Sequence, residues 1–154
     1  MNPLSRFLGI TLSLAVLAAA IMPFTSLGSY LDTSSILLVT GLVIGGLMAS
    51  FGPRAILRSL RQALASSPLP GRDVANSLAI ARHGYHLSWA AGGVGVIVGV
   101  VNLLSNLGGP SEIGPGLALA LLCLLYGALL AELVFANATQ WLQRGARPEA
   151  AQVS

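Results

Sequence analysis

The chain has 154 residues, of which 55% are hydrophobic and only 8% are charged, whereas soluble domains usually carry about 25% charged residues. A single soluble core cannot bury so much apolar surface, so the composition excludes an ordinary soluble domain and indicates an integral membrane protein. The formal net charge of +3 comes from eight arginines. They lie between apolar segments, so membrane topology explains them better than a nucleic-acid partner does.

Four apolar segments have the length of roughly 17–25 residues that a membrane-spanning helix needs. The first could also be read as a cleaved signal peptide, because Arg6 precedes an apolar core that is followed by three alanines. The apolar run continues past those alanines, which favours a retained span. We therefore expect an all-α integral membrane protein, a single domain over 1–154, with spans at about 7–27, 33–51, 87–107 and 113–137.

The arginines predict the orientation of these spans. Arg6 precedes the first span, five arginines lie between the second and third, and Arg144 and Arg147 follow the fourth. All eight therefore fall on one side of the membrane, and cytoplasmic loops carry such an excess of basic residues. This places both termini, the segment 52–86 and the tail 138–154 in the cytoplasm.

The segment 52–86 begins with a predicted amphipathic helix. Three arginines at spacings of four and three residues share one face, beside an apolar stripe. One interpretation is contact with the anionic phosphates of the inner leaflet; the other is a docking surface for another protein. The arginines are Arg54, Arg58 and Arg61, and the stripe comprises Ile56, Leu57, Leu60 and Leu64.

Small residues recur at helical spacing within the spans. Gly41 and Gly45 form one GxxxG pair, Gly95 and Gly99 form another, and Gly127 lies four residues before an alanine. Small residues let membrane helices approach closely. The pattern indicates tight helix packing, within one subunit or between several. No metal-ligand spacing, phosphate-binding loop or catalytic triad accompanies it, so we expect neither an enzyme nor a cofactor or metal site.

Three blocks of sequence resemble one known family. The first is the short loop that enters the second span, over residues 27–51; the second is the glycine pattern of 92–99; the third is the loop and fourth span over 106–116 and 125–135. These blocks resemble the MotA/TolQ/ExbB proton-channel family. The four-span order is similar to that of its flagellar stator subunits, not to the three-span order of ExbB and TolQ.

The resemblance implies a homopentameric ring in the bacterial inner membrane, with spans three and four lining its centre. The ring would surround two copies of a single-span MotB/ExbD-like partner that supplies the ion-carrying aspartate. The complex would be a proton- or sodium-driven motor or energy transducer, with no cofactor and no nucleic acid. The residues that the resemblance assigns to the ion path or lumen lining are Gly95, Val96, Gly99, Cys123, Leu124, Tyr126 and Gly127.

The chain departs from the family pattern at positions that bear on conduction. Typical members carry a threonine at the position of Val96 and two adjacent threonines at Cys123 and Leu124. The hydroxyl groups that could help an ion to pass are therefore missing. The cytoplasmic segment is also much shorter than in flagellar members. A non-conducting membrane scaffold that keeps the ring fold therefore stays open as an alternative function.

Glu132 is the only acidic residue well inside a predicted span, where family members carry an asparagine. An intramembrane carboxylate is by default a functional candidate. At ~1.5 Å per residue it lies roughly 28 Å along the fourth span, near its cytoplasmic end. It also lies about half a turn away from Cys123, so it faces away from the lumen if Cys123 faces it. Glu132 is therefore either an acid at a subunit interface or part of the ion path.

Overall fold

The computed structural model describes the backbone of residues 31–64, 71–105 and 110–150, and of residues 8–9, 11–13, 15–16 and 18–19. The chain divides into two units, Met1–Thr33 and Ser34–Ser154. The described residues near the N-terminus are helical, and Ser13 donates a hydrogen bond to the carbonyl of Gly9 at 3.0 Å. The rest of the predicted first span lies outside the described residues, so that span stays a prediction.

The described part of the second unit is almost entirely helical. Three helices are long and apolar enough to cross a membrane, over Thr33–Phe51, Val74–Ser105 and Ile113–Gln143. They contain most of the predicted second, third and fourth spans, and the last two extend further on the arginine-rich side. The elements are α2 (Thr33–Phe51), α3 (Pro53–Leu64), α4 (Gly71–Ser105), α5 (Pro110–Leu129), the π-helical η2 (Leu130–Ala136) and α6 (Asn137–Ala150).

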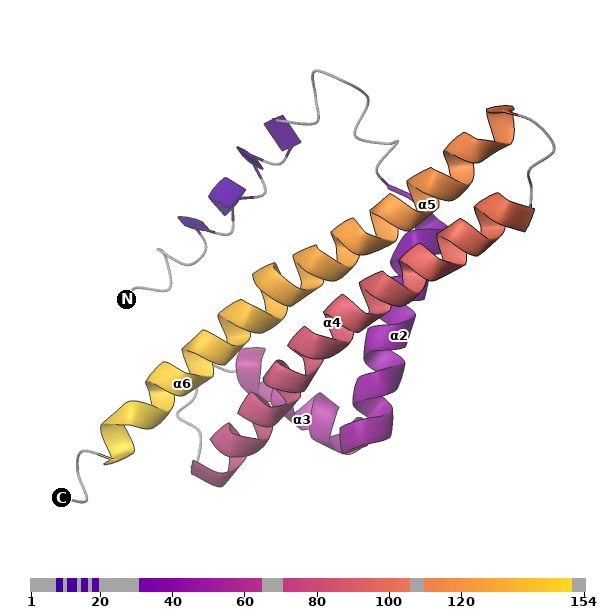
Figure 1. Ribbon diagram of the computed structural model, residues 1–154. Helices are drawn as coiled ribbons and strands as arrows, with labels where there is room; N and C mark the ends of the chain where they lie inside the picture. The colour runs from indigo at the N-terminus through magenta and orange to yellow at the C-terminus, as the bar shows by residue number, and fades with distance from the viewer. Residues whose placement is uncertain are drawn as a thin grey trace. The chain divides into compact units, whose positions relative to one another are not determined.

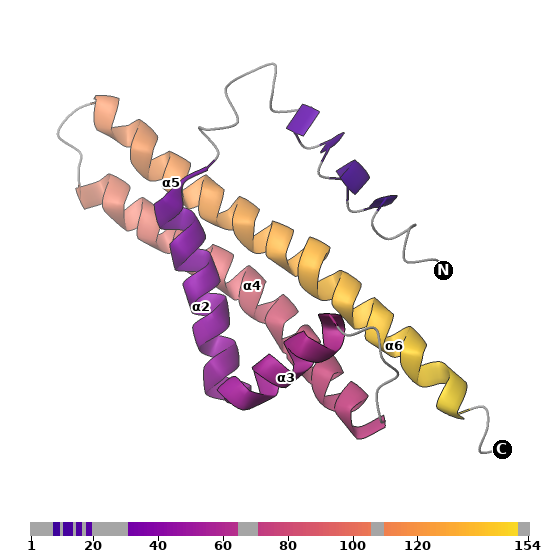
Figure 2. The same cartoon turned by 180° about the vertical axis from the view of Figure 1, so that it is seen from behind.

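A long antiparallel helical hairpin dominates this unit. One arm is α4, and the other is the continuous run of α5, η2 and α6, which lies beside it in both views (Figures 1 and 2). The 35 residues of α4 span about 52 Å at ~1.5 Å per residue. The hydrocarbon core of a bilayer is only about 30 Å thick. Both arms are therefore long enough to extend beyond a bilayer.

Glycines allow the two arms of the hairpin to approach closely. A Cβ atom built on Gly99 of α4 would lie 2.6 Å from the backbone nitrogen of Ala120 in α5. A Cβ atom on Gly127 would lie 2.7 Å from the carbonyl oxygen of Ser88. The same holds near the turn, where a Cβ atom on Gly116 would lie 2.8 Å from the Cα atom of Leu103. These backbone contacts explain the small residues at Gly99 and Gly127, since any larger side chain would separate the helices. A Cβ atom on Gly41 or Gly45 would meet nothing within 4 Å, so that predicted pair makes no close contact within the chain.

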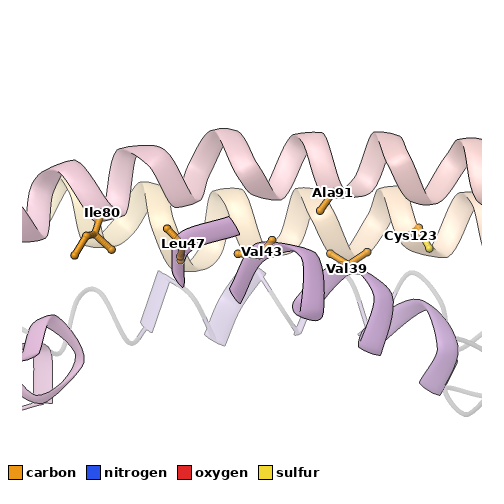
Figure 3. Packing of buried hydrophobic residues seen from close by; sticks show 6 residues of the cluster. All are labelled: Val39, Val43, Leu47, Ile80, Ala91 and Cys123. Carbon is orange, nitrogen blue, oxygen red and sulfur yellow. The ribbon is translucent and has the colours of Figure 1, made fainter. Parts of the chain in front are cut away.

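Helix α2 packs on the hairpin through one row of side chains. Val39, Val43 and Leu47 recur every fourth residue and are at most 6% exposed, because this spacing puts them on one face of a helix. In Figure 3 they face Ile80 and Cys123 of the hairpin, with which they form one buried cluster. The other faces of α2 expose large apolar side chains, as expected of a helix surrounded by lipid. Examples are Leu37, Leu42, Ile44 and Met48.

A glycine turn separates α2 from α3. Gly52 has a positive φ of 76°, and its N–H donates to the carbonyl of Met48 at 3.0 Å. This left-handed conformation is typical of a residue that ends a helix, and Pro53 then begins α3, where a missing N–H costs nothing. The turn directs α3 away from the axis of α2 (Figure 2). Ala55 and Ile56 hold α3 against the buried cluster.

Candidate functional site at the hairpin

The predicted lining residues do not share one environment in the single chain. Gly95, Gly99 and Gly127 lie in the contact between α4 and α5 and are buried. Cys123 is fully buried and belongs to the cluster that α2 also joins. A Cβ atom on Gly95 would overlap the Cβ atom of Cys123. These four residues therefore determine how closely the two arms approach.

The other predicted lining residues lie on two different sides of the hairpin. Leu124 is 39% exposed and Val96 is half-buried. Tyr126 is also half-buried, but it packs against the cluster that contains the α2 side chains. Which of these residues line a lumen in an assembly remains a prediction.

Glu132 has a specific partner on the opposite arm. The Tyr85 hydroxyl of α4 donates a hydrogen bond of 2.8 Å to a carboxylate oxygen of Glu132. Glu132 is exposed, whereas Tyr85 is half-buried. The sequence did not single out Tyr85 as a partner of Glu132. The two residues are 47 positions apart, so no local spacing reveals the contact. Two features of the sequence could have suggested this hydrogen bond: an acid within an apolar span, and a tyrosine predicted to lie at the same depth in the membrane.

The segment that carries Glu132 is π-helical. The side-chain amide of Asn137 donates to the carbonyls of Glu132 and Leu133, each at 3.1 Å. In a π turn the backbone N–H groups bond to carbonyls five residues earlier, not four, so some carbonyls lose their usual α-helical donors. The Asn137 amide supplies a donor to two carbonyls of this segment. The Phe135 ring lies where a Cβ atom of Gly84 would be, so it anchors η2 on α4. π-Helical turns are rare in proteins, and those found inside α-helices often lie at functional sites.

A shallow pocket surrounds the Tyr85–Glu132 hydrogen bond. Its volume is about 290 Å³, enough for several water molecules. It mixes one acid with basic and uncharged polar groups from both arms of the hairpin. The lining residues are Arg82, Tyr85, His86, Glu132, Ala136, Thr139 and Gln140. Within the described residues, no group of three His, Cys, Asp or Glu side chains could hold a metal ion.

The predicted basic helix forms, as α3. Arg54 and Arg58 are exposed, and Leu57, which lies next to them on the helix surface, is 52% exposed. The side chain of Arg61 lies outside the described residues. Ser59 accepts a hydrogen bond from Ser77 of α4 at 3.3 Å, which ties the opposite face of α3 to the hairpin.

Comparison with known proteins agrees with this architecture. Residues 72–154, which contain almost the whole hairpin, match the model of the MotA/TolQ/ExbB proton channel family. The chain belongs to this family. The predicted resemblance is thereby confirmed, and the apolar helices and the family together identify a bacterial membrane protein. The family is one of proton channels and motor subunits, not of enzymes.

Individual relatives match over a shorter region at higher identity. Motility protein A of Cereibacter sphaeroides is 51% identical over 47 residues, which are 30% of this chain and 19% of that protein. Chemotaxis protein PomA of Vibrio alginolyticus is 52% identical over 46 residues, 30% of this chain and 18% of that protein. Uncharacterized protein YtxD of Bacillus subtilis is 52% identical over 46 residues, which are 30% of this chain and 17% of that protein. The match thus spans less than a fifth of each relative.

Proposed function

We propose that this protein is the ring-forming subunit of a MotA/ExbB-like, ion-driven motor or energy-transducing complex. The observation that carries the proposal is the glycine-packed hairpin of α4 and α5. It lies within the region that matches the family, and its two arms touch through their backbones at Gly99 and Gly127. Close backbone contact of this kind would keep the two helices at a fixed spacing, as a wall that transmits force requires.

The side of the hairpin away from α2 is the surface that we assign to the lumen. Tyr85, Trp89 and Val96 recur at spacings of four and seven residues, so they form one stripe on α4. Trp89 is 42% exposed and Leu124 is 39% exposed, whereas α2 packs against Leu87 on another face. Val96 and Leu124 would then line the lumen. Gly95, Gly99, Gly127 and Cys123 would set the helix spacing behind them.

We base the proposed assembly on the resemblance to the family. Five copies would form the ring in the inner membrane, and each copy would contribute its first span, α2 and the hairpin. Two copies of a single-span MotB/ExbD-like protein would occupy the centre and supply the ion-carrying aspartate. Both termini and α3 would face the cytoplasm, since every arginine then lies on that side.

Helix α3 would lie on the inner leaflet. Its position directly after a span and the change of direction at Gly52 bring it to the membrane surface. Leu57 would enter the acyl boundary while Arg54 and Arg58 reach anionic headgroups, as in other interfacial helices. Arg61 belongs to the same face by its spacing.

A proton-flux measurement tests the function. The chain is co-expressed with the product of a neighbouring gene that encodes one N-terminal span bearing an aspartate, and the complex is reconstituted into vesicles. We expect proton or sodium flux that is lost when the partner's aspartate is replaced by asparagine. A purified ring that conducts neither ion with its partner present would contradict the motor function.

The scaffold function is the second candidate, and one observation favours it. Val96 and Leu124 offer no hydroxyl group on the surface that we assign to the lumen, and apolar walls solvate an ion poorly. Under this alternative the ring forms in the same way but carries no ion flux.

A further inference from the structure

We propose that Glu132, held by Tyr85, is a proton-accepting site at the arginine-rich end of the channel. The inference rests on the proposed function for its place in a conduction path. The site itself rests on the geometry of the hairpin. An acid at this position departs from the family pattern, so the site is a property of this chain.

Glu132 is hydrogen-bonded to Tyr85, which lies on the α4 stripe assigned to the lumen. Its partner Tyr85 precedes Val96 by eleven residues, which is close to three full turns, so both lie on the same face of α4. At ~1.5 Å per residue they are about 16 Å apart along the helix. The sequence argument that turned Glu132 away from the lumen assumed that Cys123 faces it. The single chain instead buries Cys123 against α2 and α4.

The carboxylate of Glu132 is accessible but held in place. One oxygen accepts the Tyr85 hydroxyl at 2.8 Å, while the exposed side chain borders a pocket wide enough for water. The backbone carbonyl of Glu132 is held by Asn137 at 3.1 Å. A carboxylate that accepts one hydrogen bond, on a backbone segment held by another, and that has room for water beside it suits repeated proton transfer.

The transfer is chemically simple. An O–H bond of a hydronium ion, or of a protonated water chain, on the lumen side breaks and leaves neutral water, while its proton forms an O–H bond at the second carboxylate oxygen of Glu132. The hydroxyl of Tyr85 keeps its own proton and its hydrogen bond to the first oxygen. The O–H bond at the second oxygen then breaks as the proton passes to pocket water, which restores the carboxylate.

The charges around the pocket favour a proton over a metal cation. Arg82 lines the same pocket, and its positive charge opposes a bound Na⁺. The pocket also receives His86 from α4, and from α6 only uncharged Thr139 and Gln140. One carboxylate with an arginine beside it does not provide the several oxygen ligands that hard metal ions take.

The test combines a spectroscopic signal with a flux. Infrared difference spectra of the reconstituted ring are recorded on acidification, for the wild type, Glu132→Gln, Glu132→Asp and Tyr85→Phe. The chain has four other acidic residues, so the Glu132 signal is the difference between the wild-type and Glu132→Gln spectra. We expect a protonated-carboxyl band in that difference, and we expect it to change frequency in Tyr85→Phe, since that variant removes the hydrogen-bond donor. Ser105→Ala, which removes a hydroxyl from the far end of α4, should leave the band unchanged. Size-exclusion profiles verify that each variant keeps the ring.

Proton flux through the ring with its partner completes the test. We expect Glu132→Gln to reduce flux to the level of empty vesicles, Glu132→Asp to retain part of it and Ser105→Ala to retain all of it. Identical carboxyl bands in the wild type and Glu132→Gln, or full flux in an intact Glu132→Gln ring, would overturn the inference. The inference would also be overturned if the wild type showed no protonation band for Glu132 and carried a sodium-dependent flux that Glu132→Gln abolishes. A Glu132 band in a ring that conducts no ion would support the proton acceptor and overturn the motor function instead.

Discussion

Gly99 of α4 lies directly against the backbone of Ala120 in α5. A Cβ atom on Gly99 would be 2.6 Å from the Ala120 nitrogen and 2.8 Å from its Cα atom. Backbone atoms cannot move aside as a flexible side chain can, so the helices themselves would have to separate. This contact explains why a glycine, and not merely a small residue, is required at that position.

We predict that Gly99→Ala destabilises the hairpin, whereas Gly93→Ala does not. Overpacking costs roughly 1–3 kcal/mol, while an exposed Gly→Ala change in a helix gains about 1 kcal/mol of intrinsic propensity. A Cβ atom on Gly93 meets nothing within 4 Å, so only the gain applies there. Unfolding titrations in mixed detergent micelles measure both variants. Equal midpoints for the two would show that α4 and α5 are not in contact at Gly99.

Replacing the α3 arginines should weaken binding to anionic membranes. We expect the triple variant Arg54→Gln, Arg58→Gln, Arg61→Gln to lose up to about 1 kcal/mol of headgroup interaction per residue. The measurement is lipid retention by native mass spectrometry, with phosphatidylglycerol and phosphatidylcholine compared in the same micelles. Retention of both lipids should be equal in the variant. If the variant keeps the wild-type preference for phosphatidylglycerol, α3 faces another protein and not the leaflet.

Hydroxyl groups in the lumen should raise conduction. We expect Val96→Thr combined with Leu124→Thr to increase proton flux through the ring, because threonine hydroxyls can hold water where two apolar side chains now exclude it. A matched control is Ile97→Thr, which adds a hydroxyl to a side chain that is 64% exposed on a different face of α4. Flux in vesicles is again the measurement. An increase in the control alone would mean that the assigned lumen face is wrong.

Labelling in intact cells checks the orientation. In a Cys123→Ala background, a cysteine introduced at Ser66 should react with a membrane-permeant maleimide and not with an impermeant one, because the arginines around it favour the cytoplasm. A cysteine introduced at Gly108, between α4 and α5, should react with both reagents. Labelling of the Ser66 site by the impermeant reagent from outside would reverse the proposed topology.

The sequence predicted the helices well, because their signals are local. Apolar length and composition identified the second, third and fourth spans, and the arginine spacing identified α3. The ends of the hairpin were harder to predict. The predicted fourth span stopped at residue 137, yet the helix continues to Ala150. A helix that leaves the bilayer loses its apolar signal but keeps its backbone hydrogen bonds, so hydropathy does not show where it ends.

The candidate site was less accessible from the sequence. Glu132 stood out because a carboxylate is rare in an apolar segment, but its partner Tyr85 lies on the other arm and depends on the register of the hairpin. That register is determined by glycine contacts such as Gly99 on Ala120 and Gly127 on Ser88. Spacing alone cannot say which glycine meets which residue. The π turn at Leu130–Ala136 likewise has no sequence pattern of its own.

The most direct test of the account is native mass spectrometry of the detergent-solubilised protein, purified with its co-expressed single-span neighbour. The ring account predicts a complex of five copies of this chain and two of the partner, and smaller assemblies when Gly99→Leu separates α4 from α5. A stable monomer or dimer of the wild-type chain under mild conditions, with the partner present, would contradict it.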